Sequence, residues 1–212
     1  AGGRRLKNVT IDEGITGIGE DACRETVLKK LLLPSTVITV NDNAFAYCRQ
    51  LEKAVLDESL NSIGCQAFMT TASLSEINIP DNVRYIGSEC FAFSGIKSVR
   101  LPENDAFMVI LRKTFLGCKN LEAIEVPDNV KSINDDAFNE CTSLRHINLD
   151  KVQMIGSSAF AETALEHITL SARKIGSWAF ALCENLKKAD LSDIGTKTLS
   201  SYLFFECNNL SE

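Results

Sequence analysis

Apolar residues recur along this chain in a pattern with a period of about 23 residues. Residues 155–170 show one unit: an isoleucine, an Ala-Phe pair, and then a short segment with apolar residues on one side. The unit begins nine times, at intervals of 20 to 24 residues, at Ile18, Val40, Ile63, Ile86, Ile110, Ile133, Ile155, Ile175 and Leu199. Such a period is typical of a solenoid, in which each repeat forms one coil.

Each unit contains a six-residue segment in which the first, fourth and sixth residues are mostly apolar, as in 121–126 and 165–170. The fourth and sixth residues share one face of a strand, and the third and fifth share the other. A second apolar pair, such as Val83 and Ile86, predicts a shorter strand. The Ala-Phe step has room for one helical or 3₁₀ turn. We therefore expect one α/β-type solenoid domain over 1–212, right-handed, with about nine coils and its parallel sheet on the concave side.

One phenylalanine per unit predicts a continuous aromatic spine through the core. The series is Phe45, Phe68, Phe91, Phe115, Phe138, Phe160, Phe180 and Phe204, and Cys23 takes this place in the first unit. A single repeat cannot bury its own apolar face, so stacked rings from neighbouring coils supply the core.

Five of the eight cysteines lie three residues after the repeat phenylalanine: Cys48, Cys118, Cys141, Cys183 and Cys207. We expect buried free thiols that pack as small apolar groups. Stacking at about 4.8 Å would permit a disulfide between adjacent coils, although parallel side-chain directions disfavour it. The sequence contains no CxxC pair and no Cys/His cluster with zinc spacing.

The net charge of −6 argues against nucleic-acid binding, which normally uses a basic stripe, and gives no attraction to anionic lipid. No apolar run approaches the roughly 20 residues that cross a bilayer, and the first residues lack the apolar segment of a signal peptide. We interpret 1–5 as an extraneous or flexible start. Both ends fall within a repeat, which predicts either a longer array or end-to-end self-association.

The repeats resemble the BspA-type (Treponema pallidum-type) leucine-rich repeat family. The resemblance is carried by IGSSAF (155–160), IGSWAF (175–180), LSEINIPDNVRYI (74–86) and LEAIEVPDNVKSI (121–133), and it covers essentially 6–212. It implies a leucine-rich-repeat solenoid displayed at a cell surface or secreted, with a role in adhesion to host or matrix proteins. The resemblance implies binding rather than catalysis and carries no defined ligand residues.

The outward residues of the predicted parallel sheet are the candidate binding surface, because solenoids commonly use this face. Arg100 is the best single anchor, since arginine often dominates protein interfaces, and Asn78 and Glu125 flank it in the neighbouring coils. The alternative interpretation is an ordinary solvated sheet face.

The only two histidines, His146 and His167, fall in one column of adjacent coils, about 5 Å apart. Both could reach one metal ion, with Glu125 or Asp190 nearby, but two ligands make a weak site. We therefore assign no metal and no cofactor.

Enzyme motifs are absent: the sequence has no catalytic Ser-His-Asp grouping, no GxGxxG and no P-loop. We interpret Asp135 and Asp136 as complementing a short helix N-terminus. The function expected is a non-catalytic protein-binding module. The alternatives are a structural spacer in a larger surface protein and, more weakly, an enzyme or metal-dependent carbohydrate binder that uses His146 and His167.

Overall fold

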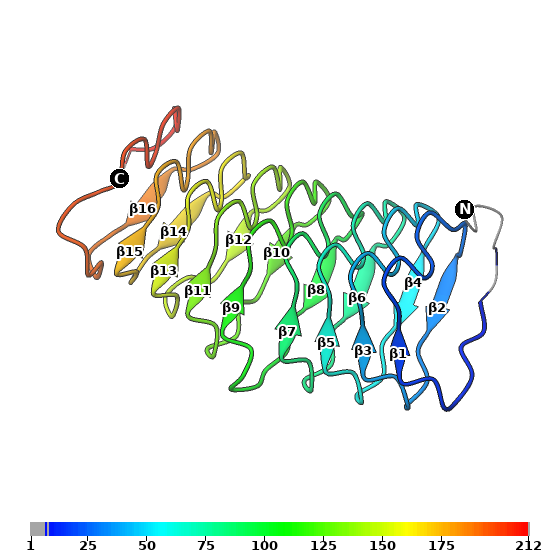
Figure 1. Ribbon diagram of the computed structural model, residues 1–212. Coiled ribbons are helices and arrows are strands. Elements are labelled where there is room, and N and C mark those ends of the chain that lie inside the picture. Colours follow the sequence, from blue (N-terminus) through cyan, green and yellow to red (C-terminus); the bar gives the residue numbers. More distant parts are fainter. Residues whose placement is uncertain (1–6, 8, 212) are drawn as a thin grey trace.

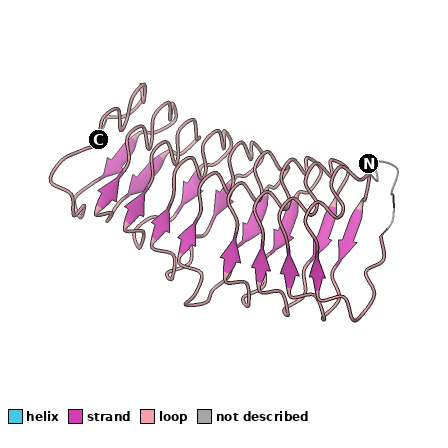
Figure 2. Cartoon of the chain, viewed as in Figure 1, coloured by secondary structure: helices cyan, strands magenta, loops and turns pink. Residues whose placement is uncertain are grey.

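The computed structural model describes residue 7 and residues 9–211, which form an elongated stack of coils (Figure 1). Each of eight coils contributes two short strands, and a ninth turn segment at 201–206 follows. The described residues contain no helix; the rest of each coil is turn and loop (Figure 2). The predicted solenoid is confirmed, and short strands with turns build all of it.

The longer strands form what we call the first sheet, and they occupy the six-residue segments that the sequence predicts. They are β2 (Lys30–Leu32), β4 (Lys53–Val55), β6 (Glu76–Asn78), β8 (Ser98–Arg100), β10 (Ala123–Ile124), β12 (His146–Ile147), β14 (His167–Thr169) and β16 (Lys188–Asp190). Hydrogen-bonded pairing is parallel and joins them as β2–β4, β6–β8, β10–β12 and β14–β16. In most of these strands the central side chain is buried between exposed neighbours, as alternation requires.

The second residue of this apolar pair, such as Ile86, ends a two-residue strand in each coil, whereas the first, such as Val83, lies before it. These strands make up what we call the second sheet. They are β1 (Gly17–Ile18), β3 (Thr39–Val40), β5 (Ser62–Ile63), β7 (Tyr85–Ile86), β9 (Val109–Ile110), β11 (Ser132–Ile133), β13 (Met154–Ile155) and β15 (Lys174–Ile175). Pairing is parallel in the orders β1-β3-β5-β7 and β9-β11-β13-β15. The break between β7 and β9 coincides with residues 101–108, the longest connection from a first-sheet strand to a second-sheet strand among the described residues. There Asn104 donates to the carbonyl oxygens of Asp81 (2.7 Å) and Val83 (2.8 Å).

Turns whose backbone N–H groups bond to the next coil take the place of the predicted helical or 3₁₀ segment. Asn43 and Tyr47, four residues apart, have φ of 56° and 60°, and equivalent pairs recur in the other coils. Between them, Phe45 N–H donates to the carbonyl of Ala67 in the next coil at 2.8 Å. An α-helix would turn every N–H along its own axis and would lose these bonds between coils. The Asp135 carboxylate likewise accepts Ser157 N–H of the next coil (2.7 Å), so the helix-capping role predicted for it is wrong.

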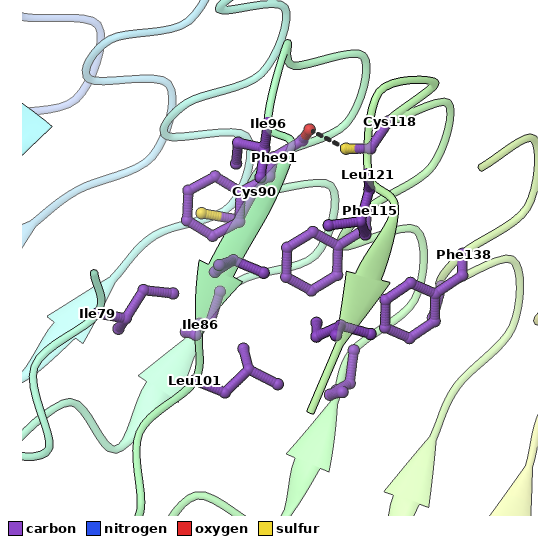
Figure 3. Close-up of a cluster of buried hydrophobic side chains, with 14 of the residues drawn as sticks. Ile79, Ile86, Cys90, Phe91, Ile96, Leu101, Phe115, Cys118, Leu121 and Phe138 are labelled. Atoms are coloured by element: carbon purple, nitrogen blue, oxygen red, sulfur yellow. Dashed lines mark hydrogen bonds between the residues drawn. The ribbon is translucent and has the colours of Figure 1, made fainter. Parts of the chain in front are cut away.

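The aromatic spine is confirmed. From Phe45 to Phe180, successive ring centroids lie 5.2–5.7 Å apart with ring planes within 15° of parallel. These seven rings are fully buried, and Phe204 extends the stack at 5.9 Å. Figure 3 shows Phe91, Phe115 and Phe138 in this arrangement. The stack runs from the second coil to the last turn, Cys23 takes its place in the first coil, and all the coils share one core.

All eight cysteines are free thiols, as the sequence predicts. The five repeat cysteines also bond between coils, because each thiol donates to a carbonyl of the preceding coil. Cys118 Sγ donates to the Phe91 carbonyl at 3.1 Å (Figure 3), and Cys141 Sγ to that of Phe115 at 3.1 Å. Burial raises the pKa of the Cys118 thiol to about 11, so it stays protonated and can donate at neutral pH.

The unit predicted to start at Leu199 departs from the pattern. Leu199 lies in no strand, and its side chain is 54% exposed. The loop before it contains a local hydrogen bond, in which Thr196 Oγ1 donates to the carbonyl of Thr198 at 2.8 Å. Leu203 and the half-buried Phe204 pack into the core instead.

Replacing a central ring of the spine should be costly. Phe115→Ala removes a fully buried ring with neighbours on both sides, so we expect the free energy of unfolding to fall by about 3–5 kcal/mol. Urea unfolding followed by circular dichroism measures this loss. Phe93→Ala is the control, because the Phe93 ring is 41% exposed. A loss below about 1 kcal/mol for Phe115→Ala would contradict the spine.

A side chain at Gly117 should destabilise the fold. Its φ is +66°, and a Cβ atom there would lie 2.5 Å from Cδ1 of Phe93. We expect Gly117→Ala to lower the free energy of unfolding by at least about 1–2 kcal/mol, the ordinary cost of the left-handed conformation. In a Phe93→Ala background the loss should shrink, since the steric part disappears. Equal losses in both backgrounds would rule out the ring contact.

Candidate functional site

Two columns of outward side chains line the first sheet, as predicted. The third positions are Lys30, Lys53, Glu76, Ser98, Ala123, His146, His167 and Lys188, and all are exposed. The fifth positions are Leu32, Val55, Asn78, Arg100, Glu125, Asn148, Thr169 and Asp190, of which Asn148 and Asp190 are half-buried. Asn148 is drawn inward because its amide both donates to and accepts from the Val126 backbone (2.8 and 2.7 Å).

The predicted anchor, Arg100, is held by an ion pair. Its Nη2 donates to Oδ2 of Asp81 at 2.9 Å, and Oδ1 of Asp81 accepts Glu103 N–H at 2.9 Å. The hydrogen bond from Arg100, followed by that from Glu103, lowers the pKa of the Asp81 carboxyl, and the same contact raises the pKa of Arg100. Both side chains are about half exposed, so the pair orients the guanidinium at the surface.

A shallow groove of about 300 Å³ lies between β8 and β10. Arg100 and Glu103 line it from the coil of β8, and Ala123, Glu125 and Pro127 line it from the coil of β10. Arg100 and Glu125, two of the predicted residues, therefore share one site. Asn78 pairs in register with Arg100 on the other side of β8 and does not line the groove. The groove combines a fixed cation, two carboxylates and a small apolar floor.

The two histidines are exposed, but they lie on strands of different hydrogen-bonded pairs. His146 on β12 is in register with Ala123, and His167 on β14 is in register with Lys188. Across residues 7 and 9–211, no group of three His, Cys, Asp or Glu side chains converges on a point that could hold a metal ion. A third ligand for the histidine pair is therefore missing from the described residues.

Comparison with known proteins identifies the repeats. The family model described as "BspA type Leucine rich repeat region (6 copies)" matches residues 2–108 and 108–212. The chain belongs to this family. A comparison with curated proteins found no match. In the described part of this BspA-type chain, no helix is long and apolar enough to cross a membrane.

Solved structures show the same fold. A leucine-rich repeat protein from Bacteroides ovatus aligns with a TM-score of 0.79 at 25% identity, over 99% of this chain and 66% of its own. A leucine-rich cell surface protein from Faecalibacterium prausnitzii aligns at 0.55 and 22% identity, over 100% of this chain and 75% of its own. A T. pallidum leucine-rich repeat protein aligns at 0.53 and 21%, covering 99% and 80%. The BspA-type chain thus spans just under two thirds of the B. ovatus protein.

A third column of charges on this BspA-type sheet was missed in the sequence reading. From Lys29 to Lys187, the second residues of the six-residue segments alternate in sign except at Ser75. Side chains of adjacent coils therefore pair: Lys29 Nζ with Glu52 (3.1 Å), and Glu166 with both Lys187 Nζ (3.1 Å) and Arg145 (3.7 Å). The hydrogen bond from Lys187 is the largest cause of the lowered pKa of Glu166. A comparison of the second residues of successive six-residue segments would have revealed this column from the sequence.

An exposed aromatic cluster on the turn side was also missed. The rings of Trp178 and Tyr202 stack with centroids 4.3 Å apart, and Phe205 meets Trp178 edge-on at 5.0 Å. Their exposed fractions are 37%, 58% and 39%. Trp178 and Tyr202 hold equivalent positions in adjacent units, 24 residues apart, so the spacing in the sequence could have revealed the stack.

The Asp81–Arg100 pair predicts a measurable titration shift. The folded-state pKa of Asp81 lies below its unfolded value, so the pair stabilises the fold above the unfolded pKa and is lost as pH falls through the folded pKa. We expect Arg100→Gln to raise the pKa of Asp81 toward 3.8, as followed by carboxyl-carbon NMR. Arg145→Gln, which disrupts a different pair, should leave Asp81 unchanged. An unshifted Asp81 in Arg100→Gln would contradict the assignment.

Proposed function

We propose that this BspA-type chain is a non-catalytic protein-binding module of a cell-surface or secreted protein, which recognises its partner through the first sheet. The observation that carries the proposal is the β8–β10 groove together with the two exposed columns. Parallel strands hold these side chains on a rigid support, whereas their identities change from coil to coil. Inward residues that repeat from coil to coil, together with outward residues that vary, suit recognition.

The groove has the composition of a small protein-recognition site. Arg100 is pre-oriented by Asp81, so little side-chain entropy is lost when it binds a partner carboxylate or carbonyl. Glu125 offers acceptors opposite it and Glu103 offers them on its own side, and the small Ala123 leaves space in the groove. We propose Asn78, His146 and His167 as the outer part of the same surface, with host or matrix proteins as partners. The cell-surface description of the F. prausnitzii protein supports this setting.

The second candidate is a structural spacer without its own partner. The continuous aromatic spine and the ion pairs between coils favour it, because they stiffen the stack without requiring a ligand. Metal-dependent carbohydrate binding at His146 and His167 would need a third metal ligand. Residues 7 and 9–211 contain no group of three such ligands, so this alternative has no structural support.

Binding to a panel of host and matrix proteins tests the first proposal. We expect at least one protein to bind the wild type, and Glu125→Lys and Ala123→Trp each to weaken that binding about tenfold or more, because they reverse a groove charge and fill its floor. Arg100→Glu should do the same. Glu184→Lys is the control, with the same change of charge on an exposed turn residue. Binding that none of the groove variants alters would contradict the first-sheet site, and no binding across the panel would favour the spacer.

A further inference from the structure

The second sheet carries exposed apolar side chains in its central coils. Tyr85 on β7, Met108 just before β9 and Met154 on β13 are 46%, 51% and 46% exposed. In the same central coils, the outward columns of the first sheet hold mainly polar and charged side chains. Exposed methionine is adaptable and recurs at protein-binding surfaces. We call the outward side of β9–β15, together with the turn residues beside it, the second-sheet face.

A groove of about 550 Å³ runs along this face across several coils. Its walls come from residues held in register, since Ser132, Met154 and Lys174 are neighbours on β11, β13 and β15. These strands lie side by side along one side of the stack in Figure 1. Gly156 and Gly176 also line the groove, and a Cβ on either would lie 2.4 or 2.3 Å from a backbone nitrogen of the preceding coil. The backbone of Gly156 and Gly176 therefore forms part of the groove floor, and the close approach of the coils leaves no room for a side chain at either position.

Two unpaired cations, Arg112 and Lys174, line the groove three coils apart. Arg84 and Arg173 directly precede β7 and β15. All four are exposed, and none has a side-chain hydrogen bond or ion pair with any residue in 7 and 9–211. Beside the first sheet, Lys29, Arg100 and Lys187 each pair with a carboxylate, whereas Lys30 and Lys53 form no ion pair with a residue in 7 and 9–211.

Two acidic side chains near the groove accept hydrogen bonds but form no ion pair with a residue in 7 and 9–211. Asp135 lines the groove in register with Arg112, one coil further on, and Oδ1 of its carboxylate accepts Ser157 N–H. Glu89, in the turn before the groove, accepts a hydrogen bond from Gln66 Nε2 at 2.7 Å. Ser132 and Asn134, which also line the groove, bond to each other at 2.9 Å. The groove thus carries two cations and one carboxylate between part-apolar walls, on a chain whose net charge is −6.

We propose that the second-sheet face binds an extended acidic peptide segment of a protein partner. Arg112 and Lys174 lie three coils apart, which is roughly 14 Å along the stack at about 4.8 Å per coil, and they are also offset along the coil. The two long side chains can span that offset, so about four residues of an extended chain match the spacing. Two carboxylates with that spacing would reach the two cations, and an apolar side chain between them would pack on Met154 and Leu111. The inference deepens the proposed protein-binding function by adding a second surface and the chemistry of its ligand. The apolar walls favour a peptide over a polyanionic glycan.

The probe for this proposal is the capped peptide Glu-Ser-Leu-Ser-Glu, which places both carboxylates and the leucine on one side when extended. Titration into the ¹⁵N-labelled chain, followed by amide NMR, should shift signals around Arg112, Met154 and Lys174. We expect peptides with Gln in place of Glu, or Ser in place of Leu, to bind at least about tenfold more weakly. Binding should also weaken with added salt.

Paired variants identify the face. Arg112→Glu with Lys174→Glu should abolish the shifts, whereas Lys30→Glu with Lys53→Glu, the same charge change on exposed residues of the first sheet, should leave affinity within about twofold. Circular dichroism confirms that both variants fold. The proposal is overturned if the peptide causes no shifts, if they map to the first sheet, or if only a heparin fragment binds. Each of these outcomes leaves the separate β8–β10 test untouched.

Discussion

Coil-to-coil stacking is the constraint on which the rest of this structure depends. No single unit of about 23 residues encloses a core, so every coil relies on the ring of the next. The turns reinforce the stack: N–H groups such as that of Phe45 leave their own coil and bond to the following one. Thiols such as that of Cys118 bond in the opposite direction, to the preceding coil. Together these contacts require the inward positions to stay nearly the same along the chain.

The same constraint explains the unusual backbone of the turns. To send alternate N–H groups sideways, the segment takes up positive φ at two places in each coil, mostly without glycine. Each such residue costs about 1–2 kcal/mol locally. The hydrogen bonds between coils and the burial of the adjacent phenylalanine offset that cost, because they exist only in this conformation. A helix would relieve the local strain but would leave the coils unconnected.

Because the inward positions are restricted, differences between coils collect on the outward faces, and the two sheets use them differently. On the first sheet, opposite charges in neighbouring coils neutralise one another, as between Lys187 and Glu166, and the β8–β10 groove with Arg100 and Glu125 interrupts that pattern. On the second sheet Arg112 and Lys174 form no ion pair with any residue in 7 and 9–211, and they lie in one groove with exposed methionine. One stack can therefore present two surfaces with different chemistry.

The sequence by itself determined the solenoid, the strand positions and the spine, because periodic apolar residues such as Phe115 have one way to be buried in a stack. It also placed Arg100 and Glu125 on one exposed face. Tertiary structure decided what those side chains contact. Asp81 lies 19 residues from Arg100 and reaches it only through coil stacking. The helical turns expected from the Ala-Phe step gave way to hydrogen bonds between coils, which local propensity does not contain. The free cations of the second sheet emerged for the same reason: whether a charge is paired depends on the neighbour in the next coil.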